Sequence, residues 1–281
     1  MNDDIAPILE KTMTRLSGKT ADEETAYLAE DGLLHCKICH APVQCRVRLW
    51  ERESIVACMC KCQEAAYQEE QKRLAQEEEQ RKIQRLKANG IQDRQLLACR
   101  FERAEDNQDV RMAKRYVENW RKVKAENLGL LLWGDVGTGK SFLAACIANA
   151  LLEQGVPVLM TNFSKILNQM GAMYSEERYQ YIASLSHFSL LIIDDLGIER
   201  GTEYALEQVY AVIDERYKTG LPVIITTNIG IEELRNPMDV QHERIYSRVL
   251  EMCTPVRVRG NDRRMQIGKS KQEVMKEVLK L

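Results

Sequence analysis

The sequence has few features of a membrane, secreted or low-complexity protein. Its longest apolar runs, residues 128–133 and 190–193, are far shorter than the roughly 20 residues that cross a bilayer. The first residues include Asp3 and Asp4, whereas a secretory signal begins with basic residues. With 15 Gly and 6 Pro among 281 residues, a collagen-like or Pro-rich chain is excluded. We therefore expect a cytoplasmic protein with no membrane partner.

The chain also lacks a net charge that would point to one kind of partner, since its formal charge is −2. Apolar residues make up 44%, which is enough for a real core, and 281 residues predict roughly two domains at about 150 residues each. The charge is uneven, because residues 256–281 hold eight basic and three acidic side chains. This segment has no interleaved aromatic residue, so the DNA binding that we expect of it would use phosphate contacts with single strands.

Nine cysteines are an odd number for disulfides, and in a cytoplasmic chain a cluster more often binds metal. Two cysteine-rich turns about 20 residues apart, with a hairpin predicted over residues 43–56, can place four thiolates around Zn²⁺ at ~2.3 Å. The candidate metal ligands are Cys36, Cys39, Cys58, Cys60 and Cys62. Five thiols compete for four places.

The favoured ligand set is Cys36, Cys39, Cys58 and either Cys60 or Cys62. Lesser candidates are Cys45, His35 and His40. An iron–sulfur cluster is the alternative metal site. A module of about 30 residues would depend on its metal to fold, and we expect it to dock a partner rather than to catalyse a reaction.

Residues 63–89 contain no Pro or Gly and carry six acidic and six basic side chains. This pattern predicts a long, largely solvated helix with ion pairs between residues four apart. A spacer is the simpler interpretation of this helix, and a partner-binding arm is the alternative.

From residue 128 onward, short apolar runs alternate with amphipathic stretches, and no internal repeat is present. Such alternation predicts βαβ units and a parallel sheet. The predicted strands are 128–133, 156–160, 190–193, 223–227 and 255–258. The predicted helices are 140–153, 163–170, 177–184 and 204–218, with one more before the first strand at 110–124.

A phosphate-binding loop lies between the first of these strands and the helix that follows it. Residues 134–141 match the pattern G-x-x-x-x-G-K-[ST], in which glycines let backbone N–H groups point at phosphate oxygens and the helix N-terminus adds positive charge. The Lys would reach the β- and γ-phosphates and the Ser hydroxyl would bind Mg²⁺. The candidate nucleotide ligands are Gly134, Asp135, Val136, Gly137, Thr138, Gly139, Lys140 and Ser141.

Two acidic residues end the apolar strand at 190–193, at the edge where α/β sheets bind ligands. Asp194 is the expected Mg²⁺ partner, and Asp195 the general base that orients the attacking water. A helix or turn cap is the alternative role of Asp195. Asn228, which ends the strand at 223–227, would bond the γ-phosphate or the water.

Arg244 and Arg248 lie one helical turn apart within the predicted helix around residues 242–250. Such arginines are ordinarily solvated. A guanidinium supplied in trans, however, can neutralise charge that develops on a γ-phosphate. This use would place the nucleotide site between neighbouring subunits of a homo-oligomer.

The order of these motifs resembles the AAA+ ATPases of the DnaC/DnaI helicase-loader and IstB transposition-helper group. The motifs are the P-loop, then Leu-Leu-Ile-Ile-Asp-Asp-Leu-Gly, Thr-Thr-Asn and Glu-Arg-Ile-Tyr-Ser-Arg. The resemblance covers roughly residues 85–270 and implies a five-stranded parallel sheet with helices on both faces. It also implies that Asn228 is the sensor-1 residue and Arg248 the arginine finger, with Arg244 close behind.

Two departures from the wider superfamily are visible. Asp195 stands where most members have Glu, so hydrolysis is expected to be slow and stimulated by a partner or DNA. A separate helical lid is not evident after residue 258, and Arg263 and Arg264 are weak candidates for a second sensor.

We therefore expect an α/β fold with a P-loop AAA+ core, preceded by a small zinc-binding module and a long charged helix. The expected divisions are residues 1–62, with one or two short amphipathic helices in the first 30 residues and then the zinc-binding module, residues 63–89 as a charged helical linker, and residues 90–281 as the ATPase domain. The expected function is ATP-dependent loading of a replicative helicase onto single-stranded DNA. The alternatives are an IstB-type transposition helper and an ATP-switched adaptor with negligible turnover. A small-molecule kinase is disfavoured because nothing resembles a substrate-phosphoryl lid.

Overall fold

The computed structural model describes residues 25–49, 52–197, 202–237, 239–260, 271–276 and 278–279. The chain divides into two compact units, Met1–Glu79 and Gln80–Leu281. The short helices expected in the first 30 residues lie mostly outside the described residues, and Ala26–Leu28 is a strand. Much of the basic segment also lies outside them.

Two antiparallel hairpins lie in the described part of the first unit. Strand β1 (Ala26–Leu28) pairs with β2 (Leu34–Cys36), and β3 (Gln44–Leu49) pairs with β4 (Arg52–Ala57). The second hairpin confirms the one predicted over residues 43–56. The hydrophobic cluster beneath them is small, with only Ala26, Cys36, Val43 and Cys60 buried among the described residues. Two of its four members are therefore cysteines.

Helix α2 spans Lys61–Gly90 and confirms the predicted charged helix. The division between the two units falls within it. Arg73 lies 2.7 Å from Glu70 and 3.6 Å from Glu77, and all three side chains are exposed. Such exposed pairs support a helix locally and contribute little to the stability of a fold.

The second unit contains a five-stranded parallel sheet, which confirms the predicted fold class. The strands are β5 (Gly129–Trp133), β6 (Val158–Asn162), β7 (Leu190–Leu196), β8 (Val223–Thr227) and β9 (Cys253–Arg257). Their order across the sheet is β6-β7-β8-β5-β9. Every pair is parallel, so all five carboxyl ends lie at one edge.

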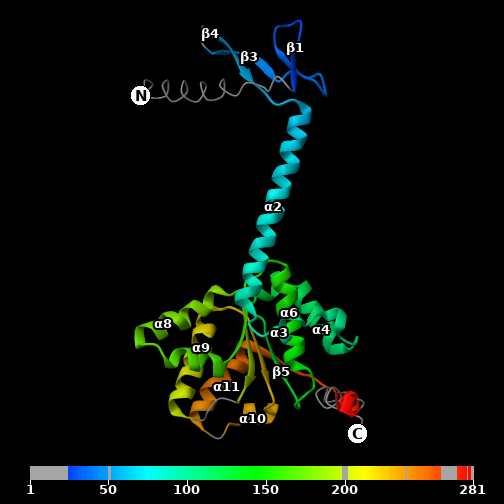
Figure 1. The fold of residues 1–281 in the computed structure, drawn as a ribbon. Helices are drawn as coiled ribbons and strands as arrows, with labels where there is room; N and C mark the ends of the chain where they lie inside the picture. Colours follow the sequence, from blue (N-terminus) through cyan, green and yellow to red (C-terminus); the bar gives the residue numbers. More distant parts are fainter. Residues whose placement is uncertain are drawn as a thin grey trace, which may run out of the picture. The chain divides into compact units, whose positions relative to one another are not determined.

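Helices cover both faces of this sheet (Figure 1). They are α3 (Arg94–Leu97), α4 (Gln108–Glu118), α5 (Trp120–Ala125), α6 (Lys140–Glu153), α7 (Phe163–Gly171), α8 (Ser175–Ser184), α9 (Glu203–Thr219), α10 (Ile231–Arg235) and α11 (Val240–Met252). Short 3₁₀ turns occur at Phe101–Arg103 and Leu185–His187.

Alternate strand residues supply the two hydrophobic cores. Leu132 and Ile192 pack with α4 and α6, whereas Leu131 and Ile193 pack with α7, α9 and α11. All four side chains are fully buried, and burial of each stabilises the fold by about 1.5–3 kcal/mol. The apolar runs in the sequence are therefore strands covered on both faces.

The single helix predicted over residues 110–124 is wrong, because α4 ends at Glu118 and α5 begins at Trp120. Between them, the Asn119 side chain donates a hydrogen bond to the carbonyl of Arg115 at 2.8 Å. Asn often competes with helical hydrogen bonding in this way. The apolar side chains of Tyr116, Val117 and Trp120 in this segment are nevertheless buried.

Candidate nucleotide-binding site and cysteine cluster

The P-loop connects β5 to α6 at the carboxyl edge of the sheet. Gly134, Gly137 and Gly139 have φ angles of 144°, 81° and 97°, which L-residues with a side chain rarely adopt. A Cβ atom at Gly134 would also lie 2.6 Å from the carbonyl oxygen of Val258. Glycine at position 134 is thus required by both backbone conformation and close packing.

Lys140 begins α6 and is buried within the loop. Its Nζ donates hydrogen bonds to the carbonyl oxygens of Gly134 at 2.9 Å and Asp135 at 2.8 Å, and to Asn228 Oδ1 at 2.6 Å. The Thr138 hydroxyl donates to the carbonyl of Asp135 at 2.9 Å. The structure thus brings the lysine of the motif together with the asparagine that ends β8. Ser141 is half-buried in the first turn of α6.

Asp194 and Asp195 lie at the end of β7, beside β8. Asp194 Oδ1 accepts a hydrogen bond from the Thr226 hydroxyl at 2.6 Å, and the backbone N–H of Asp195 donates to the same hydroxyl at 2.9 Å. Asp195 has a φ of 59°, which is uncommon for a non-glycine residue and occurs often at functional sites. Both carboxylates are half-buried.

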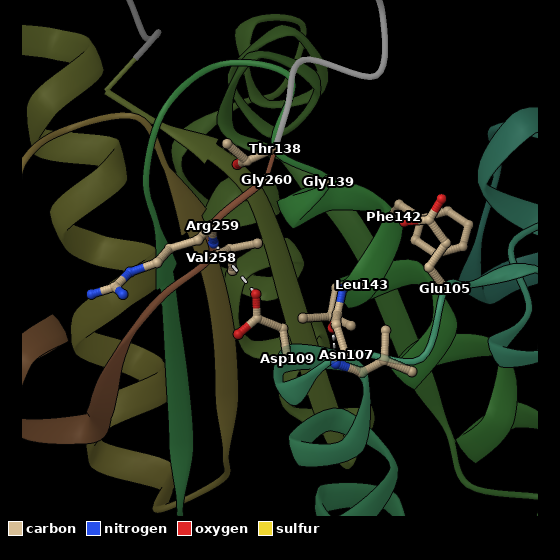
Figure 2. Close-up of a pocket in the computed structure, with 11 residues that line it drawn as sticks. Glu105, Asn107, Asp109, Thr138, Gly139, Phe142, Leu143, Val258, Arg259 and Gly260 are labelled. Carbon is tan, nitrogen blue, oxygen red and sulfur yellow. Dashed lines mark hydrogen bonds between the residues drawn. The ribbon is translucent and has the colours of Figure 1, made fainter. Parts of the chain in front are cut away.

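A pocket of about 260 Å³ lies against the P-loop (Figure 2). It lies beside the start of α6, the start of α4 and the chain that follows β9, and its lining residues include Thr138, Gly139 and Phe142. Asp109 accepts a hydrogen bond from the backbone N–H of Arg259 at 3.3 Å, which ties two of these walls together. Sequence reasoning missed this pocket because its walls come from segments far apart in the chain.

Arg248 and Arg244 have different surroundings on α11. The Arg248 Nε donates to Asp214 Oδ1 at 3.0 Å, and the guanidinium lies over the rings of Tyr210 and Tyr217, at 4.7 and 5.7 Å from their centroids. Arg244 is exposed, and no described residue bonds its guanidinium. Of the two, Arg244 is therefore the one presented to solvent.

Four cysteine sulfurs gather in the first unit. The Sγ atoms of Cys36, Cys39, Cys60 and Cys62 lie within 4.8 Å of one another. A hydrogen bond from the backbone of Ala41 lowers the pKa of the Cys39 thiol to about 6. The hydrogen bond with Cys39 raises the pKa of Cys62 to about 12. Four thiols at this separation fit a tetrahedral Zn²⁺ site.

Cys58, which the sequence favoured as a ligand, lies outside this group of four. Its backbone N–H donates to the carbonyl of Val43 and its thiol to the carbonyl of Pro42, so it extends the pairing of the β3–β4 hairpin. Cys60 and Cys62 come at the start of α2 instead, and both join the group. The spacing C-x-C-x-C does not reveal which two thiols face the hairpin turn at residues 36–39.

Two exposed tyrosines and an arginine belong to α8 and α9 or their ends: Tyr174 directly precedes α8, Arg178 lies on α8 and Tyr204 on α9. Tyr174 is 82% and Tyr204 is 44% exposed. Arg178 donates to the Tyr204 hydroxyl at 3.0 Å, and its guanidinium lies 5.8 Å from the centre of that ring. We call Tyr174, Arg178 and Tyr204 the tyrosine surface. Sequence reasoning missed it because the two helices are joined only in the fold.

No helix among the described residues is long and apolar enough to cross a membrane.

Comparison with known proteins gives relatives that match part of the chain. The chain is 24% identical over 202 residues to the replicative helicase loader DnaI of Bacillus subtilis, which covers 66% of this chain and 65% of that protein. It is 30% identical over 142 residues to the replicative helicase loader DnaC of Escherichia coli K12, which covers 49% and 55%. The chain thus spans less than two thirds of the length of either relative.

A crystal structure of a DnaC helicase loader has a similar fold, with a TM-score of 0.52 at 21% identity. The match covers 59% of this chain and all of that one. The AAA+ fold that the motifs implied is thereby confirmed. A family model described as "IstB-like ATP binding protein" matches residues 51–272, which is most of the chain. The chain therefore belongs to the family of IstB-like ATP-binding proteins.

Proposed function

We propose that this protein is an ATP-dependent loader that delivers a replicative DNA helicase to single-stranded DNA. The observation that carries the proposal is the meeting of Lys140, Asn228 and the Asp194–Thr226 pair at one edge of the sheet. Two relatives that are named replicative helicase loaders support the choice of partner. Loading would take place with the replicating DNA, in the cytoplasm.

The residues of this edge have complementary tasks in ATP binding and hydrolysis. When ATP binds, the Lys140 ammonium would leave the carbonyl oxygens of the loop and bind the β- and γ-phosphates. The pocket beside Phe142 would take the base and ribose. Mg²⁺, when bound with ATP, neutralises phosphate charge, and the Ser141 hydroxyl and Asp194 would hold it. Asp195 would orient and deprotonate the attacking water, with Asn228 bonded to the γ-phosphate or the water.

Hydrolysis would depend on a neighbouring subunit of a homo-oligomer. Arg244 is exposed on α11 and suited to reach another chain's γ-phosphate, whereas Arg248 would first have to leave Asp214. We therefore favour Arg244 as the trans-acting group and reverse the order that the family resemblance implied.

The tyrosine surface supports single-stranded DNA as the second partner. Aromatic rings that stack on bases contribute about 1–3 kcal/mol per base, and a neighbouring guanidinium adds a phosphate or stacking contact. Tyr174 and Tyr204 are exposed enough to stack, and Arg178 on α8 bonds the Tyr204 hydroxyl. The basic residues of segment 256–281 would add phosphate contacts.

The four-cysteine cluster would hold one Zn²⁺ and so fix the small module that docks the helicase. Its chemistry suits zinc, since thiolates are the ligands that structural zinc sites use most. An iron–sulfur cluster would also accept four thiolates. Metal analysis of the purified chain, with about one zinc and no iron expected, separates the two.

A second candidate is a transposition helper, and the family description favours it. A third is an adaptor whose binding is switched by ATP without hydrolysis. Asp195, at the position where most of the superfamily have Glu, favours this candidate. These candidates share the nucleotide site and differ in what they bind or whether they hydrolyse ATP.

The decisive experiment is a loading assay with the purified full chain and the replicative helicase of the organism from which it comes. Helicase retained on circular single-stranded DNA is measured with and without ATP. Retention should require ATP and the wild-type chain and should fail with Lys140→Ala, whereas Lys165→Ala, a lysine exposed on α7, should behave as wild type. A chain that binds ATP but never binds the helicase would contradict the proposal. Retention of a transposase, in a parallel assay that supplies one in place of the helicase, would favour the second candidate.

A further inference from the structure

The pairing of β7 with β8 breaks at the two aspartates. Ile193 pairs with Ile225 and Leu196 with Thr227, so β7 uses three steps where β8 uses two. The additional residue makes a β-bulge that leaves a backbone N–H of β7 without its regular partner on β8. Asp195 lies within it at a φ of 59°. The two carboxylates of the site are thus held by an irregular stretch of strand.

A single side chain fills the gap in this pairing. The Thr226 hydroxyl is fully buried, accepts the Asp195 backbone N–H at 2.9 Å and donates its proton to Asp194 Oδ1 at 2.6 Å. A hydroxyl has one proton to donate, so this arrangement fixes its direction. No described residue bonds the other carboxylate oxygen of Asp194.

We propose that Thr226 is a positioning residue of the ATP site, an inference that rests on the proposed function. Its hydroxyl selects the Asp194 rotamer that leaves Oδ2 for Mg²⁺, and it stabilises the left-handed turn that sets the direction of the Asp195 carboxylate. Thr226 itself would touch neither nucleotide nor metal. Groups that orient a metal ligand in this way change metal affinity or activity by about 10–100-fold when they are lost.

The position of Thr226 also links the two halves of the site. Strand β8 bonds Asp194 through Thr226, and Asn228, directly after the strand, accepts a hydrogen bond from Lys140. The acidic pair and the P-loop lysine are therefore held by one rigid strand that is buried on both faces. Thr227, between them, bonds the carbonyl of Leu196 at 2.7 Å and contacts neither aspartate carboxylate through its hydroxyl.

The test compares Thr226→Val, which keeps the shape and removes the hydroxyl, with Thr226→Ser, which keeps the hydroxyl. Thr227→Val is the matched control, since it removes a buried hydroxyl from the adjacent position. The Mg²⁺ concentration that gives half-maximal binding of a fluorescent ATP analogue is measured for the full chain, together with KM, kcat and melting temperature.

For Thr226→Val we expect about a tenfold higher half-maximal Mg²⁺ and about a tenfold lower kcat, with unchanged affinity for the analogue at saturating Mg²⁺. Thr226→Ser should recover most of both. Thr227→Val should lose melting temperature to a similar degree and keep the wild-type Mg²⁺ dependence. Unchanged Mg²⁺ dependence in Thr226→Val, or an equal shift in Thr227→Val, would overturn the proposal.

Failure of this inference is distinct from failure of the proposed function. If the wild-type chain binds no ATP analogue at any Mg²⁺ concentration, the ATP site itself is wrong. If the wild type binds and Thr226→Val matches it, only the role of Thr226 is wrong. Should Thr226→Val not fold, Thr226→Cys, with its weaker S–H donor, should give an intermediate shift, and wild-type Mg²⁺ dependence there would also contradict the proposal.

Discussion

The two units of this chain obtain their stability from different sources. In the described part of the first, two of the four buried hydrophobic residues are cysteines of the thiol cluster, so little apolar area is buried there without them. In the second, a sheet is covered on both faces and residues such as Leu131, Leu132 and Ile192 are fully buried. We therefore expect the first fold to depend on a metal bound at the thiol cluster, whereas the stability of the second is spread over many contacts.

Zinc removal should have the largest effect and should separate the two units. We expect a chelator, or Cys36→Ser, to unfold the region of residues 25–62 while the second unit keeps its melting transition, because structural zinc supplies about 10–16 kcal/mol in modules of this kind. Amide spectra of the full chain, with and without chelator, would locate the loss. Cys58→Ser, outside the group of four, should keep one zinc per chain.

If the first unit stayed folded in the metal-free chain, the two units would not differ in their dependence on metal, and this prediction would be wrong. Zinc loss in Cys58→Ser together with zinc retention in Cys62→Ser would also contradict it and would restore the ligand set favoured by the sequence.

In the second unit, by contrast, we expect one substitution to abolish ATP binding while the fold stays intact. We expect Lys140→Ala to weaken ATP binding at least about 100-fold, because the loop then lacks the cation that reaches the β- and γ-phosphates. Titration with a fluorescent ATP analogue measures this effect, and the melting curve monitors the fold. Tight binding by Lys140→Ala would show that the loop does not hold the phosphates.

Much of the second unit could be predicted from the sequence, because its signals are local. Apolar runs bounded by helical stretches predicted all five strands, and an eight-residue motif placed a loop between β5 and α6. Register-dependent features could not be predicted. The β7 bulge and the hydrogen bonds of Thr226 depend on how two strands 30 residues apart align.

Other side chains whose hydrogen-bond partners could not be predicted also contact residues far away in the sequence. Arg248 bonds Asp214, 34 residues earlier, and Arg178 bonds Tyr204, 26 residues later. Motif spacing indicates which residue types recur together and carries no information on such pairings. For the cysteines, spacing gave five candidate ligands and favoured Cys58, whereas the fold gathers the other four.

Substitution of the two arginines of α11 should separate an effect on the stability of the second unit from an effect on ATP hydrolysis. Arg248→Ala should lower stability by about 1.5 kcal/mol, or roughly 4 °C in melting temperature, because it removes the Asp214 bond and the contacts with two tyrosine rings. Arg244→Ala should leave the melting temperature unchanged and reduce ATP hydrolysis. Hydrolysis is measured in the assembled state, with ATP affinity as the control. If Arg248→Ala reduced hydrolysis and Arg244→Ala did not, Arg248 would be the trans-acting group.

The smallest effect should come from one ion pair, and it shows how widely the stability of the second unit is distributed. Hydrogen bonding with Lys218, together with Arg248, lowers the pKa of Asp214 below its usual 3.8. Folding therefore favours the ionised carboxylate. The stabilisation is present above pH 3.8 and is lost as the pH falls through the lower folded value.

Asp214→Asn should thus melt about 2 °C below wild type at pH 7, and the gap should narrow as the pH falls below 3.8. Asp106→Asn, in a more exposed pair with Arg111, should hardly differ from wild type at pH 7. A gap that stays constant down to pH 3 would mean that Asp214 acts through packing rather than charge. If Asp214→Asn destabilised the second unit as much as zinc removal destabilises the first, the stability of the second unit would also depend on one interaction.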